Sequence, residues 1–275
     1  MIAFLGMGLL GSNFTRALLQ RGETVHVWNR SPERAKALEL DGARAFADAG
    51  DAIGGADRVH IAVSDDAAVD SVLAAAKPTG LVIDHTTTSI AGALQRIART
   101  DMTYVHAPVF MGPQNARDAT GLMLLSGDRA RVARVTPMLA AMTGKLVDFG
   151  ERAEAASAMK LMGNTFLMGF TAAVGDLIGV GKALGFSAED AIQLFEHFNP
   201  GTTIGARAKR MASGSFAQPS WELAMARKDA RLVQAEVDRA HLALTVVPAI
   251  AAKMDEMIER GHSHDDWTVI GKDFL

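Results

Sequence analysis

Short apolar stretches alternate with longer amphipathic stretches through the first 150 residues of the chain. The short stretches predict strands, whereas apolar positions three and four residues apart predict helices between them. This alternation is typical of a doubly wound, mostly parallel sheet. The predicted strands are Ile2–Leu5, Thr24–Trp28, Arg58–Val63, Leu81–Asp84, Thr103–Val105, Leu122–Ser126 and Leu146–Phe149, and the predicted helices are Leu10–Arg21, Pro32–Asp41, Asp66–Ala76, Ile90–Arg99 and Arg129–Met142.

The pattern changes after Gly150, where helical periodicity alone continues to the C-terminus. A long helix is predicted from about Arg152 to Leu184, and because it is apolar on nearly every side we expect it to be buried all round. The chain is therefore predicted to be an α/β protein of two domains, residues 1–150 around the sheet and residues 151–275 all-helical. Since one chain of this size does not easily cover such a helix, we expect a homodimer or a homotetramer.

The composition is that of a globular protein, with 49% hydrophobic and 21% charged residues in a chain of 275. A net charge of −3 and scattered Lys and Arg residues give no footprint for nucleic acid or an anionic membrane. The absence of cysteine excludes disulfides and thiolate chemistry. No uncharged apolar run reaches the roughly 18 to 20 residues that span a bilayer. We therefore expect a cytoplasmic protein.

A glycine-rich motif joins the first strand to the first helix, and its residues are Gly6, Met7, Gly8, Leu9, Leu10 and Gly11. In this context the motif predicts a Rossmann-type dinucleotide-binding turn. Gly6 permits the turn, Gly8 lets the backbone approach a pyrophosphate, and Gly11 allows close helix–strand packing. The amides and dipole of the helix N-terminus favour the phosphates. The alternative is a glycine-rich turn without a ligand.

The second predicted strand ends in Asn29, Arg30 and Ser31. A site for NAD places Asp or Glu here, which would repel a 2′-phosphate. The guanidinium of Arg30 instead suits a phosphate, and Asn29 and Ser31 add hydrogen-bonding groups. We therefore predict NADP as the cofactor, with NADPH preferred over NADH. The alternative is an exposed Arg at the start of the next helix.

Candidate ligand-binding residues also lie at the ends of the next two strands, where Val63 ends one strand and Ser64 follows it, and Thr86 and Thr87 follow the other. Ligands of doubly wound sheets bind outside the carboxyl ends of the strands, so these residues are expected to face the nicotinamide and the substrate. Hydroxyl groups at such positions also serve as helix N-caps, and different hydroxyls can fill the two roles.

The stretch Ala155–Gly175 carries a single charge, that of Lys160. An ammonium is costly to bury unless its pKa falls or it gains a partner. Asn164 lies four residues further on, on the same face of the predicted helix, so both side chains can reach one ligand. The alternative is a Lys that extends along the helix to water.

Together with the glycine motif, four segments resemble the β-hydroxyacid dehydrogenases related to 3-hydroxyisobutyrate dehydrogenase. They are DHTT at 84–87, HAPVFMGPQNARDATGLMLLSGD at 106–128, KLMGN at 160–164 and the pair Lys228-Asp229. They are similar to the family's Asp-x-Ser-Thr, Asp-Ala-Pro-Val-Ser-Gly-Gly, Lys-x-x-x-Asn and Lys-Asp motifs. The resemblance covers essentially the whole chain.

The resemblance implies hydride transfer between NADP(H) and a small 3-hydroxy acid or semialdehyde. It implies that Lys160 is the catalytic general acid and base, for which a pKa lowered by an apolar site is suitable. The implied substrate-binding residues are Thr86, Phe110, Met111, Gly112 and Asn164. It also implies that Lys228 contacts the cofactor.

The substrate segment departs from the family pattern. Phe110-Met111-Gly112 stands where the family carries Ser-Gly-Gly, and His106 stands where it carries Asp. These changes favour a bulkier or less polar carbonyl compound. Imine reductases share this architecture and remain an alternative, although they commonly carry Asp or Tyr in place of Lys160. A protein that binds NADPH without turnover is a third.

Histidines offer no convincing metal site. His262 and His264 lie in a polar segment with Asp265 and Asp266, but nothing else in the sequence completes a ligand set, so we expect an exposed loop and no metal. His85 and His106 are expected to line the pocket.

Overall fold

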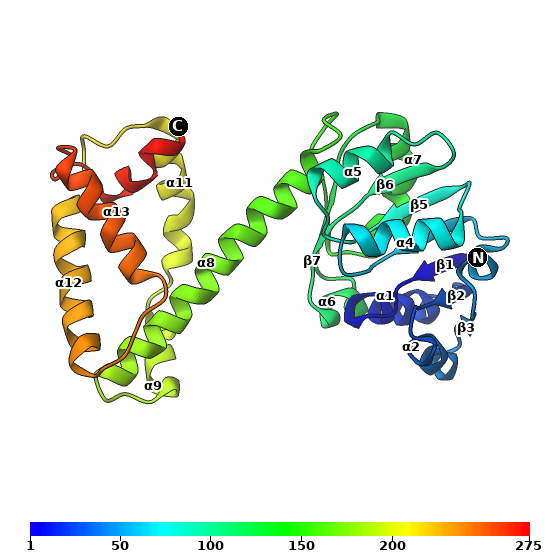
Figure 1. The fold of residues 1–275 in the computed structure, drawn as a ribbon, viewed down its shortest axis with the longest axis horizontal. Helices are drawn as coiled ribbons and strands as arrows, with labels where there is room; N and C mark the ends of the chain where they lie inside the picture. Colours follow the sequence, from blue (N-terminus) through cyan, green and yellow to red (C-terminus); the bar gives the residue numbers. More distant parts are fainter. The chain divides into compact units, whose positions relative to one another are not determined.

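The computed structural model describes all 275 residues, which form two compact units, Met1–Asn164 and Thr165–Leu275. The first unit contains a six-stranded parallel sheet in the order β3-β2-β1-β4-β5-β6 (Figure 1). Its strands are β1 (Ile2–Leu5), β2 (Val25–Trp28), β3 (Arg44–Ala45), β4 (Arg58–Ile61), β5 (Leu81–Asp84) and β6 (Thr103–His106). The order reverses beside β1, and the predicted doubly wound fold is confirmed.

Alternating side chains of the strands build a core on each face of this sheet. Ile2 and Phe4 of β1 point into one core, and Ala3 and Leu5 point into the other. Helices α1 (Leu9–Gln20) and α7 (Arg129–Ala140) pack on the first face, whereas α3 (Ala49–Ile53) and α4 (Asp66–Ala76) pack on the second. The remaining helices of the unit are α2 (Pro32–Lys36), a 3₁₀ helix (Ala37–Asp41), α5 (Ile90–Ile97) and α6 (Pro113–Asp118).

The last strands of the first unit form a second sheet, β7-β8-β9, instead of extending the first. They are β7 (Val109–Phe110), antiparallel to β8 (Leu122–Leu125), and β9 (Lys145–Asp148), parallel to β8. Pro108 separates β6 from β7, and its carbonyl accepts the amide of Leu124 at 2.9 Å. The chain thereby leaves the first sheet, a turn that the alternating pattern did not predict.

The second unit is helical. It contains the later part of α8, then α9 (Ala188–Ile192), α10 (Leu194–His197), α11 (Ile204–Ser213), α12 (Leu223–Arg239), α13 (Val247–Glu259) and two 3₁₀ helices, Pro200–Thr203 and Trp267–Phe274. Helices α12 and α13 lie side by side (Figure 1) over a small core that includes Leu223, Met254 and Met257. Asp266, which we expected in an exposed loop, is fully buried, and its carboxylate pairs with Arg210 and accepts hydrogen bonds from Ser220 and Thr268, which offset the cost of burial.

Helix α8 (Ala155–Ala183) is continuous between the units, and the compact units divide inside it instead of at residue 150. Its first turns contact the first unit, which explains the shift of this boundary. In the single chain the helix is largely exposed, with Phe166 at 54% and Met168 at 66%, so the expectation that it is buried all round is wrong for one chain. By length and composition alone, α8 also matches a membrane-spanning helix, as do core helices of many soluble proteins.

Candidate functional site

Two glycines of the turn after β1, Gly6 and Gly11, leave no room for a side chain. Gly6 has a φ of +104°, in the left-handed region, and a Cβ there would lie 2.3 Å from the carbonyl oxygen of Ala62. A Cβ on Gly11 would lie 1.9 Å from the carbonyl oxygen of Gly6. Helix α1 can therefore approach β1 only with glycine at both positions.

Gly8 differs from its two neighbours, since a Cβ placed there would meet nothing within 4 Å. It is the N-cap of α1, and no side chain caps the amides of the first turn. The open space beside Gly8 is part of a cavity of about 590 Å³. A helix N-terminus with uncapped amides facing a cavity favours phosphate binding.

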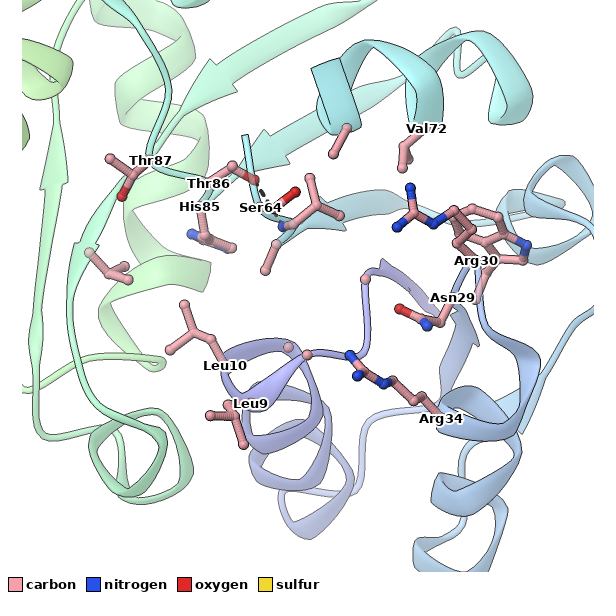
Figure 2. Close-up of a pocket in the computed structure, with 18 of the residues that line it drawn as sticks. Leu9, Leu10, Asn29, Arg30, Arg34, Ser64, Val72, His85, Thr86 and Thr87 are labelled. Atoms are coloured by element: carbon pink, nitrogen blue, oxygen red, sulfur yellow. Dashed lines mark hydrogen bonds between the residues drawn. The ribbon is translucent and has the colours of Figure 1, made fainter. Parts of the chain in front are cut away.

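Asn29, which follows β2, stabilises this turn through hydrogen bonds. Its Oδ1 accepts the amide of Met7 at 2.8 Å, and its Nδ2 donates to the carbonyl of Ser31 at 3.0 Å. Figure 2 shows Asn29 between two guanidinium groups, with Arg30 extending toward Val72 and Arg34 lying nearer the start of α1. Neither Arg is in an ion pair, and no carboxylate lines the cavity. The two cations are therefore free to meet an anion.

The loops after β4 and β5 close another side of the cavity. The hydroxyl of Thr86 accepts the amide of Val63 at 3.1 Å (Figure 2), and the amide of Thr86 donates to Asp84 at 2.8 Å. Thr86 and Thr87 line the cavity, whereas the Ser89 hydroxyl caps α5 by accepting the amide of Gly92. Different hydroxyls thus line the cavity and cap the helix, the two roles that the sequence left open.

His85 lines the cavity but holds both ring nitrogens in buried hydrogen bonds. Its Nδ1 lies 2.8 Å from the carbonyl oxygen of Ala107, so this nitrogen carries the proton, and Nε2 accepts from Nδ1 of His60 at 2.9 Å. Burial lowers the pKa of His85 to about 4. At neutral pH the ring is therefore neutral, with no proton to offer a ligand.

Lys160 enters the same cavity from α8. The residue is 8% exposed, Nζ donates to Oδ1 of Asn164 at 3.0 Å, and Nζ lies 4.0 Å from the ring centroid of Phe110. No carboxylate pairs with it, and burial lowers the pKa of its ammonium. The amide oxygen and the aromatic ring stabilise the charged form, and burial disfavours it.

The segment 110–112 places an aromatic ring where the family pattern has small residues. A Cβ on Gly163 would lie 2.2 Å from the Phe110 ring, so this ring packs directly on the backbone of α8. The amide of Gly112 donates to Oδ1 of Asn115 at 2.9 Å and is occupied within the protein. This segment therefore offers an apolar surface, and the amide of Gly112 is not available to a ligand because it already donates to Asn115.

Most of the predicted site residues meet at the cavity, and they are Gly6, Gly8, Leu9, Leu10, Gly11, Asn29, Arg30, Ser31, Val63, Ser64, Thr86, Thr87, Met111 and Lys160. Four others lie beside it, since the Met7 side chain is buried, Phe110 and Asn164 contact Lys160, and Gly112 caps α6. Lys228 lies in the second unit, where it pairs with Asp229 at 3.0 Å.

The sequence analysis missed several lining residues, namely Trp28, Arg34, Ala62, Ala68, Ser71, Val72 and Val109. Arg34 had a signal, because it lies one turn along the helix that starts beside Arg30. His106, expected to line the cavity, is instead buried behind Thr86, whose carbonyl oxygen lies 2.8 Å from its Nε2.

Comparisons with known proteins agree with this fold. Residues 1–150 match the NAD binding domain of 6-phosphogluconate dehydrogenase. A probable 3-hydroxyisobutyrate dehydrogenase of Mycobacterium tuberculosis is 31% identical over 195 residues, which are 68% of this chain and 66% of that protein. An imine reductase from Pseudomonas sp. superposes with a TM-score of 0.91 at 23% identity, covering 100% of this chain and 99% of the other.

A reductive aminase from Aspergillus terreus, in complex with NADPH and ethyl levulinate, also has a TM-score of 0.91, at 21% identity and with coverage of 100% and 99%. The fold, the glycine turn and these matches define an NAD(P)-dependent oxidoreductase. The chain belongs to the β-hydroxyacid dehydrogenase family, as the sequence motifs predicted.

The two glycines of α1 give a matched test of the nucleotide site. Gly8→Ala places a methyl group in open cavity space, so we expect unchanged thermal stability and weaker NADPH binding. Gly11→Ala collides with the Gly6 carbonyl, so we expect a loss of stability of about 2 kcal/mol or more. Calorimetric unfolding and NADPH titration measure both effects. Unchanged NADPH affinity in Gly8→Ala would place the phosphates elsewhere.

Proposed function

We propose that the protein transfers a hydride between NADP(H) and a small 3-hydroxy acid or the matching semialdehyde, with Lys160 as the general acid and base. The observation that carries the proposal is the buried, carboxylate-free ammonium of Lys160 at a cavity that also contains the glycine turn. A buried Lys with a lowered pKa exchanges protons more readily near neutrality than an exposed one.

The residues of the first unit fit NADP(H). Uncapped amides at the start of α1 and the open space at Gly8 suit the pyrophosphate. Arg30 and Arg34 suit the 2′-phosphate, and no carboxylate stands there to repel it. Arg34 thus joins the residues proposed to select NADP. Lys228, in the second unit, is proposed as a further cofactor contact.

When bound, the nicotinamide supplies or accepts the hydride. In reduction Nζ of Lys160 donates a proton to the carbonyl oxygen of the substrate, and in oxidation it takes the proton of the hydroxyl group. Asn164 accepts a hydrogen bond from Nζ at 3.0 Å and so keeps the donor from turning away. Thr86 and Met111 line the cavity beside Lys160 and are proposed to contact the substrate.

Imine reduction on the same scaffold is the second candidate. The Phe110 ring packed against Lys160 favours it, because an apolar surface suits a neutral carbonyl compound or imine better than a carboxylate. The likeness to imine reductases supports the scaffold and not the substrate. Lys160 supplies a proton in either reaction.

We also propose that a second copy of the chain covers the exposed face of α8, which makes the protein at least a homodimer in the cytoplasm. Met162, Phe166 and Phe170 are each about half exposed, and the rings of Phe166 and Phe170 stack at 6.4 Å. Soluble monomers rarely expose so large an apolar surface.

Replacing Lys160 tests the proposed chemistry. We expect Lys160→Ala and Lys160→Arg each to lower kcat by about 10²- to 10⁴-fold, because Arg keeps the charge but does not release a proton. NADPH consumption is measured against succinic, tartronate and methylmalonate semialdehydes, an apolar ketone, and a ketone with an amine. NADPH affinity serves as the control and should not change. Reaction of the ketone–amine mixture alone would replace the semialdehyde proposal by imine reduction.

The pH dependence follows from the same residue. Burial lowers the pKa of Lys160, and reduction needs the protonated form. We expect kcat for reduction to be level at low pH and to fall as pH rises through this lowered pKa, whereas kcat for oxidation rises over the same range. A profile that Lys160→Ala leaves unchanged would assign the proton transfer to another group.

Arg30 and Arg34 are expected to select NADP. Each Ala variant should weaken NADPH binding by about tenfold and leave NADH binding within about twofold, since each change removes one charged hydrogen-bonding partner of the 2′-phosphate. Titration of both cofactors measures this. Arg44→Ala, outside the cavity, is the control. Equal weakening for both cofactors would contradict the assignment.

The exposed face of α8 predicts the oligomeric state. We expect light scattering without detergent to give at least twice the mass of one chain, and Phe166→Glu with Phe170→Glu to give the monomer. Leu40→Glu, at an exposed leucine outside α8, should leave the mass unchanged. A wild-type monomer would contradict the proposal.

A further inference from the structure

His106 connects two parts of the first unit that carry the proposed chemistry. It ends β6, is 4% exposed, and lies between the loop after β5 and the first turn of α8. Its Nε2 is 2.8 Å from the carbonyl oxygen of Thr86, and its Nδ1 is 2.7 Å from Oγ of Ser157. Nε2 also lies 3.5 Å from the hydroxyl of Thr88, which belongs to the same loop as Thr86, so the two ring nitrogens contact two different parts of the unit.

The partners determine which nitrogen carries the proton. A carbonyl oxygen only accepts, so Nε2 donates to Thr86, and Nδ1 of the neutral ring accepts from the Ser157 hydroxyl. Burial lowers the pKa of His106, partly offset by the nearby Asp84 carboxylate, which favours the neutral ring at neutral pH. The Asp of the family pattern could not donate to the carbonyl oxygen, because a carboxylate only accepts.

Both ends of this bridge lead to the cavity. Thr86 lines it and is held by hydrogen bonds at its amide, hydroxyl and carbonyl groups. Ser157 lies three residues before Lys160, on the adjoining turn of α8. A shift of Ser157 would therefore move the backbone from which Lys160 extends.

We propose that His106 is a positioning residue. It acts through Ser157 on α8 and Thr86 in the loop after β5 to fix the distance between Nζ of Lys160 and Thr86 at the cavity. The inference rests on the proposed role of Lys160. It concerns a residue that touches neither the cavity nor Nζ. Its effect should therefore fall on the chemical step and on the environment of Nζ, and not on cofactor affinity.

The experiment compares His106→Phe, which keeps an aromatic ring and removes both hydrogen bonds, with Ser157→Ala and the double variant. We expect kcat to fall about tenfold in His106→Phe, with less than about a twofold change in NADPH affinity, because small misplacements of a catalytic group slow reactions strongly. If His106 and Ser157 act as one bridge, kcat of the double variant should be no lower than kcat of His106→Phe. His106→Gln, whose amide both donates and accepts, should recover part of kcat.

Thr143→Ala is the matched control, because it also removes a buried hydroxyl of the first unit. This hydroxyl donates to the carbonyl of Gly121 at 2.6 Å, and neither residue lines the cavity. It should leave kcat unchanged. If kcat falls equally in Thr143→Ala, or if the losses of kcat add up in the double variant, the effect is a general destabilisation of the unit and the inference is overturned.

A second readout needs no substrate. The ¹³Cε signal of Lys160 in NADP⁺-bound protein, identified by its loss in Lys160→Arg, is followed with pH. We expect His106→Phe and Ser157→Ala to raise the Lys160 pKa toward that of an exposed Lys, because a displaced Nζ regains water. Unchanged pKa values would overturn the inference. Absence of turnover with every carbonyl compound would refute the proposed function alone.

Discussion

The buried ammonium of Lys160 is the constraint on which the site depends. No carboxylate pairs with it. The charged form is stabilised only by weaker partners, which are the amide oxygen of Asn164 at 3.0 Å and the Phe110 ring at 4.0 Å. A carboxylate partner would stabilise the ammonium and raise its pKa. Asn164 and Phe110 carry no negative charge, so they do not raise the pKa in this way, and burial lowers it.

Such a group needs rigid surroundings, and the first unit supplies them by satisfying nearly every polar atom around the loop after β5. The hydroxyl of Tyr104 donates to Asp84 at 2.5 Å, Asp84 accepts the amide of Thr86, and His106 donates to the carbonyl of Thr86. The whole chain has no buried side-chain nitrogen or oxygen without a hydrogen bond. A fully satisfied polar network favours a single arrangement of the loop.

The sequence predicted most of the fold because the strands of the parallel sheet are mainly apolar and the glycine motif is local. It missed β3, α3, β7 and α6, because two to six residues are too few to show a period. It overestimated the burial of α8, since apolar composition does not reveal whether the same chain or a partner covers a helix. The role of His106 depends on contacts with two separate elements, the loop after β5 and helix α8, which a linear pattern does not encode.

The two halves of the cavity differ in how freely their residues can change. Gly6 and Gly11 are fixed by backbone contacts at distances that no side chain permits. Phe110 is instead one member of a pair, because its ring occupies the space that Gly163 leaves empty on α8. A smaller residue at 110 would expose that space and remove the ring from Nζ. The half of the cavity at the glycine turn is therefore constrained by the main chain, whereas the half beside Phe110 is set by a side chain and can diverge while the fold is retained.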